Sequence, residues 1–134
     1  NREEEREMLP LCVDMNIAVI PWSPMARGKL TRAWDESTNR TESDEFGRYL
    51  YGMEESDRAV ADAVAAVAEG RGVPRAQVAL AWVLRNPAVT SPIIGATKPH
   101  HIDDAVAAVE LELTDDEVKT LEDPYVPHPI VGFA

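Results

Sequence analysis

Two short segments of the sequence combine side chains that could bind a small charged ligand. In residues 21–30, an aromatic ring at Trp22 and a hydroxyl at Ser23 are followed by Gly28, which lies between two basic residues. Trp22 could stack on a flat ring, while Ser23 and backbone N–H groups could donate to phosphate oxygens. Gly28 would let such a ligand approach the backbone closely. A plain turn around a buried tryptophan accounts equally well for this composition.

The second segment, residues 95–99, places Gly95, Thr97, Lys98 and Pro99 directly before a predicted helix. The first turn of a helix carries free N–H groups and the positive end of the helix dipole, so a hydroxyl and a lysine beside it would favour an anion. Alternatively, Thr97 caps the helix and Lys98 is solvated. The residues alone leave both interpretations open.

Metal chemistry and the common nucleotide-binding motifs have no support in this sequence. The adjacent histidines His100 and His101 would diverge by about 100° on a helix, so they could not share a metal ion. Cys12 is the single cysteine, which excludes an intrachain disulfide and a cysteine-based zinc site. Neither the glycine-rich Rossmann motif nor the P-loop motif occurs. We therefore predict no metal ligands, and we expect Cys12 to be a small core residue.

The composition restricts the classes of partner. The chain has 134 residues and a formal net charge of -11, from 13 basic and 24 acidic residues, which argues against nucleic acid or an anionic membrane surface as the ligand. No apolar run approaches the roughly 18 residues of a membrane span, and no export signal opens the chain. We therefore expect a cytoplasmic protein. Since the sequence begins at Asn1 rather than at methionine, we also expect it to be part of a longer chain.

Two short strands must position the candidate segments. Residues 17–20 form a continuous apolar run that ends at Pro21, and residues 90–94 are expected to form a second short buried strand that ends at Gly95. Such runs are typical of strands buried in a parallel sheet, and ligand sites in parallel α/β folds lie at the carboxyl ends of the strands. If the two strands are neighbours, both candidate segments lie at the same edge of the sheet, which favours a binding site.

Helical patterns surround these strands. Apolar residues at helical spacing predict helices over residues 2–15, 56–69, 74–85, 99–109 and 115–121. Four of these helices present an apolar face that we expect to point inward: Met8, Leu11, Cys12 and Met15 in the first, Val60, Val64, Ala65 and Val67 in the second, Val78, Ala79, Ala81, Trp82 and Leu84 in the third, and Ile102, Val106 and Val109 in the fourth. The intervening residues 21–55 show no sustained period and suit a lid or binding loop.

The order of elements predicts a parallel α/β fold, because strands alternate with helices. However, about two strands cannot close a barrel, and each would expose an edge that a missing neighbour should cover. We therefore expect the chain to be an incomplete part of a larger α/β domain.

Three segments resemble the C-terminal portion of the aldo-keto reductase family: residues 20–28 (Ile-Pro-Trp-Ser-Pro-Met-Ala-Arg-Gly), 79–84 (Ala-Leu-Ala-Trp-Val-Leu) and 92–98 (Pro-Ile-Ile-Gly-Ala-Thr-Lys). The resemblance extends from Asn1 to about Pro127. It implies a (β/α)8 TIM barrel, with residues 1–134 as the C-terminal segment of a single barrel domain that holds the last two strands and their helices. It also implies that NADP(H) binds in an extended form without a Rossmann fold, and that aldehydes or ketones are reduced by hydride transfer.

The resemblance implies roles for the first segment and for the loop after it. Trp22 would stack on the nicotinamide, and Arg40 matches a basic residue that reaches the adenine side. Four residues would follow the pyrophosphate: Ser23, Pro24, Met25 and Gly28. Among them, Met25 stands where leucine is more usual.

The resemblance also implies roles for the second segment. Three residues would hold the adenosine 2′-phosphate: Gly95, Thr97 and Lys98. His101 stands where glutamine is common, and Asp104 stands where an acid contacts the adenine amine. Ala105 stands where asparagine is common.

The family's catalytic Asp, Tyr, Lys and His lie on earlier strands, and no residue of this chain matches them. The resemblance therefore implies that the chain carries cofactor-binding half-sites and no catalytic residue, and that it is inactive alone. Its expected partners are a small carbonyl substrate and the remainder of its own barrel. The alternative is a non-catalytic, nucleotide-binding regulatory subunit of the same fold.

Overall fold

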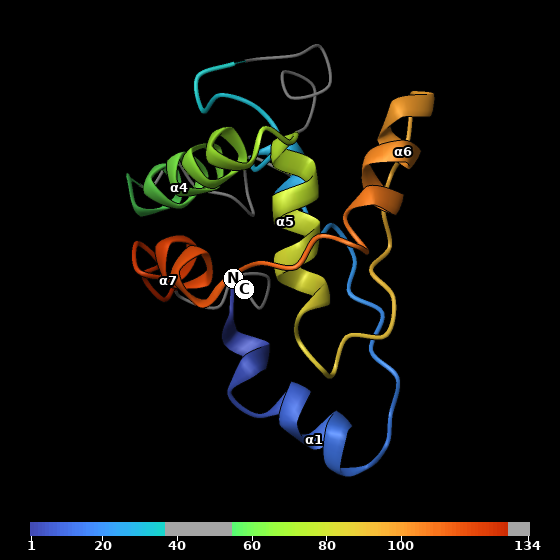
Figure 1. Cartoon of the computed structure of the whole chain (residues 1–134). Coiled ribbons are helices and arrows are strands. Elements are labelled where there is room, and N and C mark those ends of the chain that lie inside the picture. The colour runs from blue at the N-terminus through green and yellow to red at the C-terminus, as the bar shows by residue number, and fades with distance from the viewer. Residues whose placement is uncertain (37–54, 129–134) are drawn as a thin grey trace, which may run out of the picture.

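The computed structural model describes residues 1–36 and 55–128 of the chain. The helices in this part are, in chain order, the 3₁₀ turn η1 (Glu3–Glu5), α1 (Met8–Asp14), the 3₁₀ turn η2 (Ala26–Gly28), α4 (Glu55–Arg71), α5 (Arg75–Leu84), α6 (Pro99–Ala107) and α7 (Asp115–Glu122). Figure 1 shows α4 and α7 side by side, α5 packed against α4, and α6 on the other side of α5. Helix α1 lies apart from this group, at one end of the molecule.

The buried core lies where α4, α5 and α7 meet. Its central side chains come from all three helices: Val64, Val67 and Ala68 from α4, Val78 from α5 and Leu121 from α7. Val78 is fully buried, and the partly exposed Trp82 packs against the same cluster. The inward face predicted for the second helix is therefore confirmed at Val64 and Val67.

Helix α4 ends in a cap formed around a glycine. Gly72 has a φ of +67°, which a residue without a Cβ adopts readily. Its N–H donates to the Glu69 carbonyl at 3.1 Å, and the Val73 N–H donates to the Ala68 carbonyl at 3.0 Å. These two bonds form a Schellman motif, which satisfies carbonyl groups that the end of a helix otherwise leaves unpaired.

Helix α7 begins with a capping box. The Thr114 hydroxyl accepts from the backbone N–H of Glu117, and the Glu117 carboxylate accepts in return from the N–H of Thr114. Both contacts lie within one helical turn, so this signal can be recognised from local sequence alone.

The prediction of two regular strands is wrong for the described residues. The two segments meet instead in isolated parallel bridges: Val19 with Val89, and Trp22 with Ile93. Two residues separate the bridge partners in the first segment and three in the second, so the register shifts by one residue between the bridges. This shift, together with the missing N–H groups of Pro21 and Pro92, interrupts the hydrogen-bond ladder that a continuous strand needs. The parallel adjacency of the two segments is nevertheless confirmed.

The helix predicted over residues 2–15 is divided in two. The turn η1 ends at Glu5 and α1 begins at Met8, so the break precedes Pro10. Pro10 lies at the third position of α1, where an N–H group would have no acceptor within the helix, and its ring is therefore tolerated.

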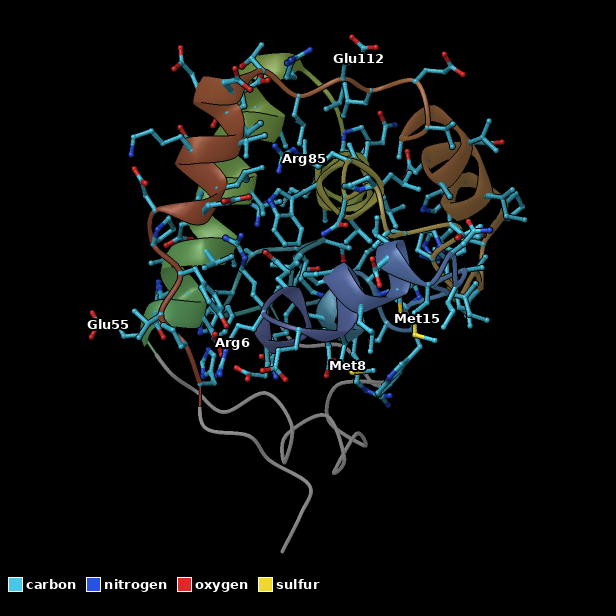
Figure 2. The ribbon with its side chains drawn as sticks, turned by 90° about the horizontal axis from the view of Figure 1, so that it is seen from below. Arg6, Met8, Met15, Glu55, Arg85 and Glu112 are labelled. Carbon is cyan, nitrogen blue, oxygen red and sulfur yellow. The ribbon has the colours of Figure 1, made fainter. Side chains whose placement is uncertain are left out.

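The apolar faces predicted for the first and fourth helices are exposed in the part of the chain that the structure describes. The exposed fraction is 52% for Met8, the first residue of α1, and 59% for Met15, its C-cap, and Figure 2 shows both side chains on the side of α1 that is turned away from α5. Cys12, expected in the core, is only partly buried. Ile102 and Val106 of α6 are more than half exposed, as is Val109, two residues after its end. The prediction that these faces are buried is wrong because no described element packs on them.

Candidate functional site

The parallel bridge between Trp22 and Ile93 brings the two predicted binding segments together. The Ile93 N–H donates to the Pro21 carbonyl at 2.8 Å, which holds the starts of both segments side by side. From this bridge the first segment continues into η2 and the second continues to the N-terminus of α6 (Figure 1). The prediction that both segments follow the same edge of a parallel pair is therefore confirmed.

Trp22 is not a core tryptophan in this structure. Its exposed fraction is 59%, and the neighbouring Ile20 and Ile93 are also more than half exposed. These side chains form an apolar surface at the start of the two segments. An exposed indole of this kind can stack on a flat ring, whereas a buried one could not.

Residues 23–28 form a tight turn with several left-handed residues. The φ angles are +52° at Ser23, +48° at Ala26, +53° at Arg27 and +96° at Gly28. The Ser23 carbonyl accepts from the Ala26 N–H at 3.0 Å, and the Ser23 Oγ accepts from the Arg27 N–H at 3.1 Å. Because Oγ is the acceptor in this bond, the hydroxyl proton of Ser23 can point to a phosphate oxygen. The N–H groups of Ala26 and Arg27 are used within the turn.

The glycine of this turn packs against the chain's own arginine. A Cβ atom at Gly28 would collide with the guanidinium of Arg32. The close approach expected at Gly28 is therefore made by Arg32, while the preceding Pro24 and Met25 are partly buried.

The second segment presents its predicted binding residues to solvent. Gly95, Thr97 and Lys98 are all exposed, and Lys98 is the extended residue at the N-cap of α6. No side chain caps this helix, so Thr97 is not the cap that the alternative interpretation required. Instead, the Thr97 N–H donates to Nδ1 of His101 at 3.2 Å. The uncapped helix end and the Lys98 ammonium give this position a positive character.

Asp104 and His101 already have partners within the chain. Oδ1 of Asp104 accepts from Nε2 of Gln77 at 2.9 Å, which ties α6 to α5. The His101 ring packs edge-on against that of His100, with ring centroids 4.5 Å apart. The carboxylate predicted to lie near an adenine amine is therefore held in place by an amide of α5.

Three further points concern Arg40, metal ligands and membrane-spanning helices. Arg40 lies outside the described residues. Within residues 1–36 and 55–128, no three His, Cys, Asp or Glu side chains gather as a metal ion would require. No helix in these two ranges is both long enough and apolar enough to cross a membrane.

Three residues that hold the candidate segments were not predicted: Arg32, Arg75 and Gln77. Each makes a hydrogen bond that fixes one of the two segments. No motif or period in the sequence indicates them, because the contacts of Arg75 and Gln77 join residues far apart in the chain.

The fold and the site define a part of an α/β protein in which two parallel β segments lead into a tight turn and a helix N-terminus. A profile of the Aldo/keto reductase family matches residues 1–125. The chain belongs to the aldo-keto reductase family, whose members are oxidoreductases with a TIM-barrel fold.

Individual relatives agree with this assignment. The chain is 44% identical over 132 residues to the versiconal hemiacetal acetate reductase of Aspergillus parasiticus, an alignment that covers 96% of this chain and 38% of that protein. It is 40% identical over 133 residues to an aldo-keto reductase of Alternaria alternata, covering 99% of this chain and 36% of that protein. The chain thus spans under two fifths of the length of these relatives.

Solved structures show the same relationship. The glycerol dehydrogenase of Gluconobacter oxydans matches with a TM-score of 0.76 and 27% identity, over 98% of this chain and 42% of that one. A thermostable aldo-keto reductase in complex with the inhibitor epalrestat matches with a TM-score of 0.61 and 21% identity, over 93% of this chain and 36% of that one. The second similarity shows the fold alone.

Proposed function

We propose that this chain is the C-terminal, cofactor-binding part of an NADP(H)-dependent oxidoreductase that reduces aldehydes or ketones. The observation that carries this proposal is the parallel bridge between Trp22 and Ile93. Because of this bridge, an exposed indole and the uncapped N-terminus of α6 follow the same edge. A ligand with both a flat ring and phosphate groups suits that combination.

The side chains at this edge fit a phosphorylated dinucleotide. Trp22 offers an apolar face to a ring, and the Ser23 hydroxyl can donate to a pyrophosphate oxygen. Lys98, with Gly95 and Thr97 beside it, places a positive charge where a 2′-phosphate would benefit from it. NADPH, when bound, supplies the hydride for carbonyl reduction.

We further propose that the remainder of a barrel, from outside this chain, covers the apolar faces that α1 and α6 expose. Met15 at the end of α1 and Val109 after α6 are both more than half exposed, and burial of such side chains is normally strongly favourable. The short span relative to the relatives supports this view. The groups that donate and accept protons at the substrate would also come from that remainder, and no residue of this chain is assigned a catalytic role.

The proposal is tested with the full-length protein, NADPH and a panel of aldehydes and ketones. The expected result is oxidation of NADPH, which is measured as the loss of its near-ultraviolet absorbance. Quenching of tryptophan fluorescence by NADP⁺ measures binding independently of turnover. Binding without turnover on any carbonyl compound of the panel would favour the regulatory subunit, and the absence of binding would refute the proposal.

A further inference from the structure

Building on the proposed function, we propose that the first turn of α5 positions both cofactor half-sites, namely the turn at residues 23–28 and the N-terminus of α6. Arg75 positions the turn, and Gln77, two residues further along the same helix, positions α6. Both are positioning residues, because Arg75 contacts the Arg32 carbonyl and Gln77 contacts the Asp104 carboxylate rather than a ligand.

The carbonyl of Gly28 is the point at which the turn is held. Thr31 donates to it twice, from its backbone N–H at 3.2 Å and from its hydroxyl at 3.0 Å. Arg32 adds a third hydrogen bond, from Nε at 3.0 Å. Left-handed conformations at non-glycine residues such as Ala26 and Arg27 are costly, and they persist only where the surrounding structure enforces them. The three hydrogen bonds from Thr31 and Arg32 to the Gly28 carbonyl hold the turn in this conformation.

Arg75 connects this turn to the core. Its Nη1 donates to the Arg32 carbonyl at 2.6 Å, in a partly buried contact between residues 43 positions apart. The bond fixes the backbone of the same residue whose side chain holds Gly28. Arg75 is the first residue of α5, and Val78, on the next turn, is fully buried in the core. The hydrogen bond of Arg75 therefore attaches the turn to a helix that is packed firmly in the core.

Gln77 makes the corresponding connection to the second half-site. Its Nε2 donates to Oδ1 of Asp104 at 2.9 Å, again in a partly buried contact. Asp104 lies on α6, whose N-cap is Lys98. Because Arg75 and Gln77 share one rigid helical turn, together they set the separation between the Gly28 turn and the N-terminus of α6. A dinucleotide that must reach both places at once is sensitive to this separation.

The test measures dissociation constants for NADPH in the full-length protein, by fluorescence quenching, together with KM and kcat. Arg75→Ala is expected to raise the Kd and the KM for NADPH by about tenfold, as expected for a lost charged hydrogen bond, with a change in kcat of less than about twofold. Arg75→Lys, which keeps a positively charged N–H donor, is expected to restore part of the affinity. The matched control is Arg85→Ala, which removes the arginine at the C-cap of the same helix. Arg85 pairs with Glu122 at 3.5 Å, and its loss is expected to leave the Kd unchanged.

Adenosine 2′-phosphate distinguishes the two positioning residues, because it engages only the α6 half-site. Gln77→Ala is expected to weaken binding of both NADPH and adenosine 2′-phosphate. Arg75→Ala is expected to weaken NADPH binding and to leave the binding of adenosine 2′-phosphate unchanged. A general loss of structure would instead weaken both ligands in both variants.

The outcomes separate the positioning role from the proposed function. If the unaltered protein does not bind NADPH, the proposed function itself is refuted. If it does bind, and Arg75→Ala and Gln77→Ala bind NADPH as tightly as Arg85→Ala does, the positioning role alone is overturned. If Arg75→Ala does not fold, Arg75→Gln takes its place with the same two outcomes, since its shorter side chain cannot span the contact to Arg32.

Discussion

The guanidinium of Arg71 forms a two-point ion pair with the carboxylate of Glu117, with Nε and Nη2 each 2.5 Å from a carboxylate oxygen. This pair joins the last residue of α4 to the first turn of α7. The same carboxylate accepts from the Thr114 N–H at 2.7 Å, and Arg71 also donates to the Glu112 carbonyl at 2.9 Å. One side chain, Glu117, therefore completes the cap of α7 and also fastens α7 to α4 over the core.

Acid is expected to destabilise the protein in part through Glu117. Its pKa is lowered from 4.5 to about 2, chiefly by the hydrogen bond from Arg71 and then by that from the backbone of Thr114. A carboxyl group with a lowered pKa contributes stability that is fully present above its unfolded pKa and is lost as the pH falls through its folded pKa. The free energy of unfolding should therefore decrease between pH 4.5 and about pH 2. Urea unfolding across this range measures the decrease.

The control variant for this prediction also loses one carboxylate, but at a position away from the Arg71–Glu117 pair. Glu117→Gln should flatten the pH dependence in this window, whereas Glu110→Gln, at an exposed position, should retain it. A pH dependence in Glu117→Gln equal to that of the unaltered protein would contradict the assignment.

The Thr114 hydroxyl should contribute measurably to stability. Thr114→Ala removes the acceptor of the Glu117 N–H, which lies 3.3 Å from Oγ1, and loss of such a cap costs about 1 kcal/mol. Thr120→Ala is the matched control, because the Thr120 hydroxyl only donates to the Asp116 carbonyl within the same helix and should cost less than about 0.5 kcal/mol. Urea unfolding of both variants checks the difference, and equal losses would argue against a role for the cap.

Arg2 fastens the N-terminal segment to residues at the other end of the chain. Its backbone N–H donates to the Tyr125 hydroxyl at 3.0 Å, its guanidinium pairs with Glu122 at 3.1 Å, and the guanidinium lies 5.3 Å from the ring centroid of Trp82. Arg2→Ala is expected to lower the free energy of unfolding by about 1–2 kcal/mol. Arg6→Ala, whose side chain is 71% exposed beside Glu3, should change it by less than about 0.5 kcal/mol. A loss for Arg6→Ala as large as that for Arg2→Ala would contradict this role of Arg2.

The parts of the fold that could be predicted from sequence are those that depend on neighbouring residues. The Gly72 helix end and the capping box at Thr114 are each formed within a few residues, so their signals are local. The extent of the two strands could not be predicted, because the register shift between the bridges arises only when the segments pair. The exposure of the apolar faces of α1 and α6 could not be predicted either, because periodicity identifies a face without identifying what covers it.

The candidate site likewise has features that could be predicted from the sequence and features that could not. The N-terminal position of Lys98 and the adjacency of the two segments follow from the order of elements along the chain, whereas the sequence left open whether Trp22 is exposed or buried. The contact of Arg32 with Gly28 and the bond from Arg75 to the Arg32 carbonyl do not follow from that order, because they depend on how a turn folds back on itself and on a helix far along the chain. Sequence patterns thus located the two segments, and only the structure shows what holds them.

Gly28 should be intolerant of any side chain. Gly28→Ala would place a Cβ at a φ of +96° and against the guanidinium of Arg32, so it should destabilise the protein by about 1–2 kcal/mol and weaken NADPH binding. Gly70→Ala is the control, because no atom lies within 4 Å of the added Cβ and alanine is the better helix former by about 0.5–1 kcal/mol. Thermal unfolding and NADPH titration check both variants. Unchanged stability and NADPH affinity in Gly28→Ala would show that Arg32 and the turn adjust freely.

Lys98 should discriminate between the two nicotinamide cofactors. It is exposed at the N-cap of α6, where its charge adds to the positive end of the helix dipole, and only NADPH carries the 2′-phosphate that would use this charge. Lys98→Gln is therefore expected to raise the Kd for NADPH by about tenfold and that for NADH by less than about twofold, measured by fluorescence quenching at low salt.

A matched variant and a salt series complete this test. Lys119→Gln removes a lysine that pairs with Asp123 at 2.6 Å on α7, and it should leave both dissociation constants unchanged. Because a charge at an exposed position is screened by salt, the difference between NADPH and NADH in the unaltered protein should narrow as the ionic strength rises. Equal losses of NADPH and NADH affinity in Lys98→Gln would contradict the assignment, since they would mean that Lys98 acts on a part common to both cofactors.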